Sequence, residues 1–300
     1  MLNICIPAFN YDVSNLVKSL HEQCRDEKIE FSILIYEDGS DIVFVKLNKS
    51  LTSLPQVSHF VCEVNKGRSA ARNFLISKTE VGKILFIDCD SIIPDKNYIK
   101  KYIEHFDKTI VCGGTIYQKS QKTTSHELRY KYGLKREMTS AYKRNISPNK
   151  SFATNNFLAS KELFNEVSFR DFLKQYGHED SLLGFELLKK DINIFHIDNP
   201  VIHNGIESNE VFLNKTNEGL KNLIIIEKSK DIDSSFTQEI RIVNNYLRLK
   251  KICLVWLPYL IFKIFKNNIL KHLLVSKNPI LRIFDLYKFG YYCELKKINK

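Results

Sequence analysis

In the first hundred residues, short apolar segments with strand character alternate with segments that have helical spacing. Strands are predicted at 2–6, 31–36, 57–64 and 84–87, and helices at 12–25 and from about residue 67 onwards. This βα alternation predicts a mostly parallel central sheet with helices on its faces. In such sheets, ligands bind beyond the carboxyl ends of the strands.

A polar cluster follows each predicted strand. The four clusters are Pro7–Asn10, Glu37–Asp41, Asn65–Asn73 and Asp88–Asp90. Any one of them could be an ordinary turn. Because parallel strands end at the same edge of a sheet, the four together predict a ligand-binding rim.

The Asp88-Cys89-Asp90 cluster is the most informative of the four. Alternation along the chain places Asp88 and Asp90 on the same side, where both could face one ion. Carboxylate oxygens suit Mg²⁺ or Mn²⁺ bound together with a phosphate-bearing substrate. The alternative is an acidic turn that caps the next helix.

Asp38 ends the second predicted strand and precedes Gly39. Its carboxylate could accept the imide N–H of a uracil base, a directional contact that discriminates between bases. Asp-Gly is also a common turn pair, so an Asx-turn is the alternative.

The segment Asn65–Gly67 predicts a tight turn followed by exposed N–H groups at a helix start. Such a turn suits phosphate or ribose oxygens. Simple capping of the helix by Asn65 or Ser69 is the alternative. Arg68 and Arg72 are four residues apart on one face of this helix, and one of them is expected to pack on the surface.

Asp180 is the candidate catalytic base. It follows His178-Glu179 and precedes a segment with the apolar pattern of a helix. The helix macrodipole is expected to lower the pKa of Asp180 and keep it ionised, so that it could take the proton of an attacking hydroxyl. N-capping by Glu179 or Asp180 is the alternative. His178 is predicted to be a positioning residue.

Two histidines flank the short segment 197–202. His203 could complete the shell of a cation beside Asp90, or it could be structural. His196 is predicted to be a histidine with satisfied hydrogen bonds in a strand.

Charge divides the chain unevenly. Residues 241–300 hold 13 Lys and Arg against two acidic residues, whereas residues 1–240 are balanced, so the tail carries all of the net charge of +11. The 11-residue apolar run 252–262 is too short to span a bilayer, which needs about 20 residues. Apolar and aromatic residues among cations favour a helix on an anionic membrane surface. A helical subdomain packed on the core is the alternative, and nucleic-acid binding is disfavoured.

Cysteine usage and the N-terminus bear on the cellular compartment. The seven cysteines are odd in number and scattered, which favours reduced thiols in the cytoplasm over disulfides or a zinc site. The chain begins directly with a predicted strand, so a secretory signal is not expected. The basic, tyrosine-containing segment 118–150 is interpreted as a solvated helical face, with a mobile substrate loop as the alternative.

These motifs, in this order, resemble an inverting family 2 glycosyltransferase with the GT-A fold. The resemblance covers residues 3–90 and 150–205. It implies a catalytic domain over 1–215, with a nucleotide-sugar half (1–115) and an acceptor half (116–215), and a basic helical region over 216–300.

The resemblance also implies roles for single residues. Asp180 would be the general base, and Asp90 and His203 would hold Mn²⁺ or Mg²⁺. Asn155, Asn156, His178 and Glu179 would lie near the acceptor or the donor sugar. The nucleotide-sugar site would comprise Pro7, Phe9, Glu37, Asp38, Asn65, Lys66, Gly67, Arg72, Asp88 and Cys89.

The resulting prediction is a metal-dependent hexosyl- or N-acetylhexosaminyltransferase. It would move a sugar from a UDP-sugar to a hydroxyl of a glycan or lipid-linked acceptor in cell-surface polysaccharide synthesis, at the inner face of the membrane. The alternatives are a sugar nucleotidyltransferase and a catalytically silent, membrane-associated binding or scaffold protein. No Gly-rich, Arg-containing loop follows the first strand, which disfavours the nucleotidyltransferase.

Overall fold

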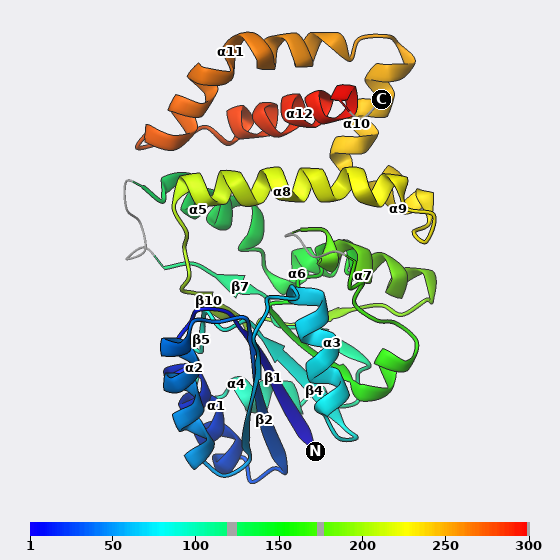
Figure 1. Ribbon diagram of the computed structural model, residues 1–300. Coiled ribbons are helices and arrows are strands. Elements are labelled where there is room, and N and C mark those ends of the chain that lie inside the picture. Colours follow the sequence, from blue (N-terminus) through cyan, green and yellow to red (C-terminus); the bar gives the residue numbers. More distant parts are fainter. Residues whose placement is uncertain (119–124, 173–176, 299–300) are drawn as a thin grey trace. The chain divides into compact units, whose positions relative to one another are not determined.

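The computed structural model describes residues 1–118, 125–172 and 177–298. Within these residues the chain forms two compact units (Figure 1). The first consists of residues 1–118, 136–172 and 179–205, and the second of 125–135, 177–178 and 206–298. The predicted domain boundary after residue 215 falls within helix α8 (Asn209–Lys228).

The first unit contains a seven-stranded sheet of order β3-β2-β1-β4-β8-β6-β9. All neighbouring strands are parallel except β8, which runs antiparallel to both β4 and β6. The predicted, mostly parallel GT-A sheet is therefore confirmed. Its strands are β1 (Leu2–Ala8), β2 (Phe31–Asp38), β3 (Val57–Cys62), β4 (Lys83–Ile87), β6 (Ile110–Cys112), β8 (Asn156–Ser160) and β9 (Phe195–His196).

Helices cover both faces of this sheet. Along β1, Leu2, Ile4 and Ile6 pack in one apolar cluster, with α1 and α4, whereas Cys5 packs in a second cluster, with α3 and α7. This alternation follows from the two-residue period of a strand, and burial on both faces explains why β1 is apolar apart from Asn3. The helices are α1 (Ser14–Asp26), α2 (Ile42–Lys49), α3 (Arg68–Lys78), α4 (Tyr98–Ile103), α6 (Ala141–Arg144) and α7 (Glu179–Lys189), with 3₁₀ turns at Ser50–Ser53, Asn149–Ser151 and Lys161–Asn165.

A second, three-stranded sheet has the order β5-β10-β7. Its strands are β5 (Ser91–Ile92), β7 (Thr115–Ile116) and β10 (Val201–His203). Strand β10 is antiparallel to β5 and pairs His203 with Ser91. This register brings His203 next to the Asp88–Asp90 segment, although more than a hundred residues separate them in the chain.

Two arginines of the 118–150 segment contradict its interpretation as a solvated face, since both Arg129 and Arg144 are buried. Arg144 donates to the carbonyls of Gly113 and Ile197 and to Nδ1 of His196. A buried guanidinium is tolerated when its donors find such acceptors. His196 is buried in β9 with both ring nitrogens in contact with polar atoms, as predicted.

The second unit is helical and has an apolar interior of its own, which confirms the predicted helical C-terminal region. In one cluster, Phe262 of α11 packs with Phe212 of α8 and with Phe284 and Tyr287 of α12. Gly290 of α12 lies so close to α11 that an added Cβ would be 2.3 Å from Cβ of Phe262. Its helices are α5 (Glu127–Tyr132), α8 (Asn209–Lys228), α9 (Ser234–Glu239), α10 (Arg241–Lys251), α11 (Trp256–Val275) and α12 (Leu281–Ile298), and a π-helical turn spans Gly133–Glu137.

Within the described ranges, no single helix is long and apolar enough to cross a membrane. Helices α10 and α11 together satisfy that test by length and composition, with a bend of 118° between them.

Candidate active site

The polar clusters that follow β1, β2, β3 and β4 meet at one edge of the main sheet. The parallel register aligns Ala8 of β1 with Glu37 of β2, and Cys5 of β1 with Phe86 of β4. Strand β8 is antiparallel to β4 and pairs Asn156 with Ile87, so its amino end lies at the same edge. Residues from the middle of the chain thus join the four clusters.

Asp38 holds the turn before α3. Its two carboxylate oxygens accept the backbone N–H groups of Lys66 and Gly67, at 2.8 and 2.9 Å, and its carbonyl accepts Nδ2 of Asn65 at 2.9 Å. Burial raises the pKa of Asp38, and the two backbone hydrogen bonds oppose that rise. Each carboxylate oxygen keeps a further lone pair, so these contacts leave acceptor capacity for a ligand.

Glu37 is fully buried, which argues against its expected contact with the nucleotide. Its carboxylate accepts from Ser40 Oγ at 2.5 Å and Asn48 Nδ2 at 2.7 Å, and it lies 3.3 Å from Nε2 of His59. Burial alone would raise the pKa of Glu37, but the hydrogen bonds from His59, Ser40 and Asn48 together lower it. Glu37 therefore stabilises the loop after β2 through its hydrogen bonds with Ser40 and Asn48.

At the end of β1, Pro7 is partly exposed and the ring of Phe9 is 51% exposed. Asn10 follows with φ of 50°, and its side chain accepts the N–H of Asp41 at 2.7 Å while its own N–H donates to Ser40. These bonds tie the first polar cluster to the second. They leave the Phe9 ring available for stacking.

Arg72 and Asp88 form a buried ion pair. Nη2 of Arg72 donates to Oδ1 of Asp88 at 2.9 Å, and the Arg72 side chain is 1% exposed. The guanidinium also lies over the ring of Phe169, 5.5 Å from its centroid. Nε and Nη1 of Arg72 find no hydrogen-bond acceptor among the described residues. Buried N–H groups of this kind are stabilised by an incoming acceptor oxygen. Of the two arginines of α3, Arg68 is the exposed one.

Asp88 and Asp90 have different partners, so the expectation that both face one ion stays a prediction. Asp88 pairs with Arg72, whereas Oδ2 of Asp90 lies 3.5 Å from Nδ1 of His203. Gly205 packs against Asp90, and a Cβ there would be 2.6 Å from Oδ2. No group of three or more His, Cys, Asp or Glu side chains that could hold a metal occurs in the described part of the chain.

Cys89 lies between the two aspartates and is partly buried against the apolar interior. Burial, followed by the charges of Asp90 and Asp88, raises the pKa of its thiol to about 12. The thiol is therefore neutral at physiological pH and does not act as a nucleophile.

The pKa of Asp180 is raised to about 6, which contradicts the expectation that the helix dipole lowers it. Burial is the main cause, and the neighbouring Glu179 adds to it, while Arg72 and a hydrogen bond from Thr154 oppose it. Thr154 Oγ1 donates to Oδ1 of Asp180 at 2.5 Å. Desolvation outweighs the dipole of α7 here. A carboxylate with a pKa near neutrality is well matched to general base catalysis.

The neighbours of Asp180 in sequence have separate environments. Glu179 is buried, and its Oε1 lies 3.8 Å from Nη1 of Arg68. His178 has φ of 75° and belongs to the second unit, so its predicted positioning role stays a prediction.

The two asparagines at the start of β8, Asn155 and Asn156, have different environments. Asn155 lies at the sheet edge, where its carbonyl accepts the N–H of Asp88 at 3.0 Å. The side chain of Asn156 is fully buried and saturated with hydrogen bonds, so it does not reach a sugar itself, and its predicted place near the sugar stays a prediction. Its Oδ1 accepts the hydroxyls of Tyr98 and Tyr102, and its Nδ2 donates to two backbone carbonyls.

Thr154 and Gly205 are site residues that sequence reasoning missed. Thr154 immediately precedes Asn155 and was the nearest neighbour of a recognised motif. Gly205 follows His203 by two residues, and a small residue there is the one local sign of close packing.

Solved structures similar to this chain share its GT-A fold. TarS 1–349 of S. aureus in complex with UDP-GlcNAc is 14% identical with a TM-score of 0.53, covering 100% of this chain and 92% of that one. A longer TarS structure is 16% identical with a TM-score of 0.52, and the match covers 79% of this chain but only 41% of that one. The mannosyltransferase PcManGT of Pyrobaculum calidifontis, in complex with GDP-Man and Mn²⁺, is 10% identical with a TM-score of 0.60, covering 99% of this chain and 86% of that one.

The α/β sheet, its acidic edge and this likeness define a protein of the GT-A glycosyltransferase class. Residues 3–168, more than half of the chain, match the family model described as glycosyl transferase family 2. The chain therefore belongs to glycosyltransferase family 2 and is a glycosyltransferase. No curated protein matches it by sequence. The family assignment supports the leading prediction over a sugar nucleotidyltransferase or a silent scaffold.

Proposed function

We propose that this glycosyltransferase is inverting and metal-dependent, and that it moves a sugar from a UDP-sugar to a hydroxyl of a glycan or lipid-linked acceptor. The observation that carries the proposal is the environment of Asp180. Its carboxylate has a pKa of about 6 and accepts a hydrogen bond from Thr154.

The partners and the burial of the carboxylates in the site favour inversion of the anomeric configuration. Asp180 can accept the proton of the acceptor hydroxyl as that oxygen attacks the anomeric carbon. A retaining reaction through a covalent intermediate needs a second carboxylate as nucleophile. Asp88 is engaged by Arg72, and Glu37 is fully buried, so neither is available for that task. A single displacement assisted by one base inverts the anomeric configuration.

The donor would lie along the edge from Phe9 to Asp90. Asp38 has remaining acceptor capacity for the imide of a uracil, and Pro7 and Asn65 lie at the same edge. The unpaired Nε and Nη1 of Arg72 offer donors to donor oxygens near Asp88. Two of the similar structures hold UDP or UDP-GlcNAc, which supports a uracil nucleotide. One holds GDP-Man instead, so the base is the first variable to test.

Asp90 and His203 fit a divalent cation that is shared with a substrate. Together they offer one carboxylate and one imidazole, 3.5 Å apart, and substrate phosphates commonly supply the remaining ligands of such ions. The Mn²⁺ in the similar mannosyltransferase structure supports this assignment. When bound, the ion would neutralise charge on the departing nucleoside diphosphate. Asp88 is not counted as a ligand, because Arg72 already engages it.

The proposal is tested by nucleotide release from a panel of nucleotide sugars, with Mn²⁺, with Mg²⁺ or with EDTA. We expect turnover with a UDP-sugar that EDTA abolishes and Mn²⁺ restores. The anomeric configuration of the product is then read by NMR on a simple sugar acceptor. Retained configuration would exclude the single displacement, and full activity in EDTA would exclude the metal.

A further inference from the structure

Helices α10 and α11 are rich in basic residues. Residues 241–275, which form these helices and the turn between them, contain seven Lys and Arg and no Asp or Glu. The cations Arg248, Lys250 and Lys251 are at the end of α10 and lead directly into the exposed Ile252. We name residues 238–266 the α10–α11 corner.

Helix α11 is apolar on two opposite sides. One side carries Phe262, which is fully buried in the interior of the second unit. The other side carries Trp256, Leu260 and Ile264 at four-residue intervals, and these side chains are 57%, 42% and 63% exposed. A helix that is apolar on both sides needs a second apolar partner, and an exposed apolar face of this kind marks a binding surface.

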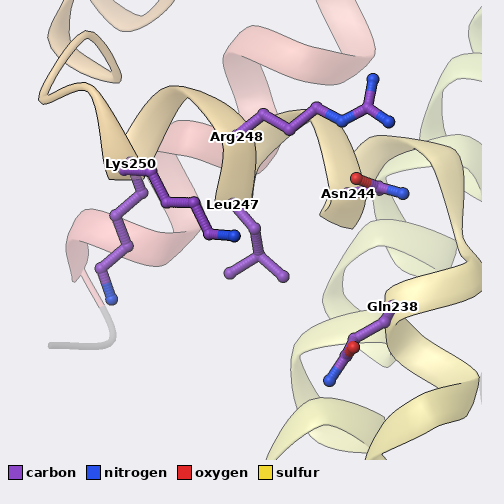
Figure 2. A pocket seen from close by; sticks show the side chains of 6 residues that line it. Gln238, Asn244, Leu247, Arg248 and Lys250 are labelled. Atoms are coloured by element: carbon purple, nitrogen blue, oxygen red, sulfur yellow. The ribbon is translucent and has the colours of Figure 1, made fainter.

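A cavity of about 680 Å³ lies at the end of α9 and along α10. Figure 2 shows Arg248 and Lys250 on α10 and Gln238 on α9, with Leu247 among them. The lining is completed by Asn244 and Lys251, so it offers three cations and two amides and no carboxylate. Such a lining is complementary to an anionic phosphate group with an apolar attachment.

We propose that the α10–α11 corner binds the surface of an anionic lipid bilayer. Lipid phosphates would occupy the basic cavity, while Trp256, Leu260 and Ile264 would enter the boundary between headgroups and acyl chains. A lipid surface offers dense negative charge beside hydrocarbon, which complements the cations and exposed apolar side chains of this corner. Tryptophan is the residue most suited to that boundary, because its ring is apolar and its N–H is polar.

The test uses the full chain, whose single tryptophan reports directly on the proposed surface. The chain is mixed with vesicles of phosphatidylcholine alone or with about 30% phosphatidylglycerol added. We expect co-sedimentation and a blue shift of Trp256 emission with the anionic vesicles, both weakened by salt. Failure to bind the anionic vesicles at low salt would overturn the proposal.

Two sets of variants distinguish vesicle binding by the α10–α11 corner from binding through net charge alone. The triple variant Arg248→Gln, Lys250→Gln, Lys251→Gln should weaken vesicle binding about 100-fold, because each cation near an anionic surface contributes about fivefold. A control removes the same charge elsewhere, at exposed lysines of the first unit, and should bind normally: Lys46→Gln, Lys49→Gln and Lys100→Gln. Equal weakening in both would show that net charge alone acts, which contradicts a defined site.

A last pair of measurements addresses other occupants. The variant Leu260→Ser, Ile264→Ser should lose at least about tenfold in vesicle affinity while its folding is unchanged, since both side chains are exposed. Salt-sensitive binding to RNA with no shift of Trp256 emission, or a dimer that buries this face, would replace the lipid assignment. Turnover of a soluble donor and acceptor should not change in any of these variants, so this proposal can fail independently of the proposed function.

Discussion

Replacing Asp180 with asparagine should abolish transfer and at the same time stabilise the protein. The side chain keeps its shape, and its Oδ1 can still accept the hydroxyl of Thr154. Removal of a general base slows a reaction by about 10²–10⁴-fold. Binding of the nucleotide sugar should be nearly unchanged, because the base acts on the acceptor.

The gain in stability follows from the raised pKa. Burial moves the pKa of Asp180 from 3.8 to about 6, so ionising it in the folded state costs about 3 kcal/mol relative to the unfolded chain. Between about pH 4 and pH 6, the carboxyl of Asp180 is protonated in the folded state but ionised in the unfolded chain. The stability that this proton contributes to the folded state is therefore fully present below about pH 4 and is lost as the pH rises through about 6. Asparagine is neutral throughout. Part of the cost is repulsion from Glu179, and we expect a net gain of about 1–3 kcal/mol at neutral pH.

The assay compares the two proteins by urea unfolding at about pH 4.5 and pH 7.5, together with nucleotide release. The Asp180→Asn variant should exceed the native protein in stability by less at the lower pH than at the higher one. Asp26→Asn is the matched control, because Asp26 is exposed, and it should change neither property. If the stability difference between the Asp180→Asn variant and the native protein does not depend on pH, the raised pKa is refuted. Undiminished transfer would refute the base.

Two further substitutions probe the support of the site. Thr154→Val removes a hydrogen bond that lowers the pKa of Asp180. The acidic limb of the pH–rate profile should therefore move up by about one pH unit. An unmoved limb would show that this hydrogen bond has no role in setting the pKa of Asp180. Gly205→Ala places a Cβ 2.6 Å from Oδ2 of Asp90. This variant should need about tenfold more Mn²⁺ for half-maximal activity. Its helix content, measured by circular dichroism, should not fall. Unchanged metal activation in that variant would argue against Asp90 as a ligand.

The sheet and its polar edge were predictable because their signals are local. A mostly apolar run such as 2–6 indicates a buried strand, and a polar cluster directly after it indicates that the strand ends nearby. The structure extends the first strand by two residues and keeps its place in the sheet. Helix α2 was not predicted, and its exposed Ile42 and Val43 show why, since they break the pattern of an amphipathic helix.

Side-chain roles were less predictable, because they depend on partners from distant segments. Asn155 and Asn156 are indistinguishable in sequence, yet one contacts the segment of Asp88 and the other is enclosed by tyrosine hydroxyls. Arg144 falls in a basic stretch whose composition indicates a solvated face, but the carbonyls it binds come from about 30 and 50 residues away. Local composition cannot reveal such acceptors.

In the proposed mechanism, Asp88 and Asp90 of one acidic motif have two different tasks. The buried guanidinium of Arg72 engages Asp88, and the register of β10 against β5 delivers His203 to Asp90. A slip of one residue in that register would turn His203 to the opposite face of the strand and remove the imidazole from the acidic motif. Arg72 also lowers the pKa of Asp180, so the same cation acts on both the proposed donor site and the proposed base. In the proposed mechanism, the donor site and the base are therefore electrostatically linked through Arg72, which the sequence shows only as one of two arginines in the helix after the third strand.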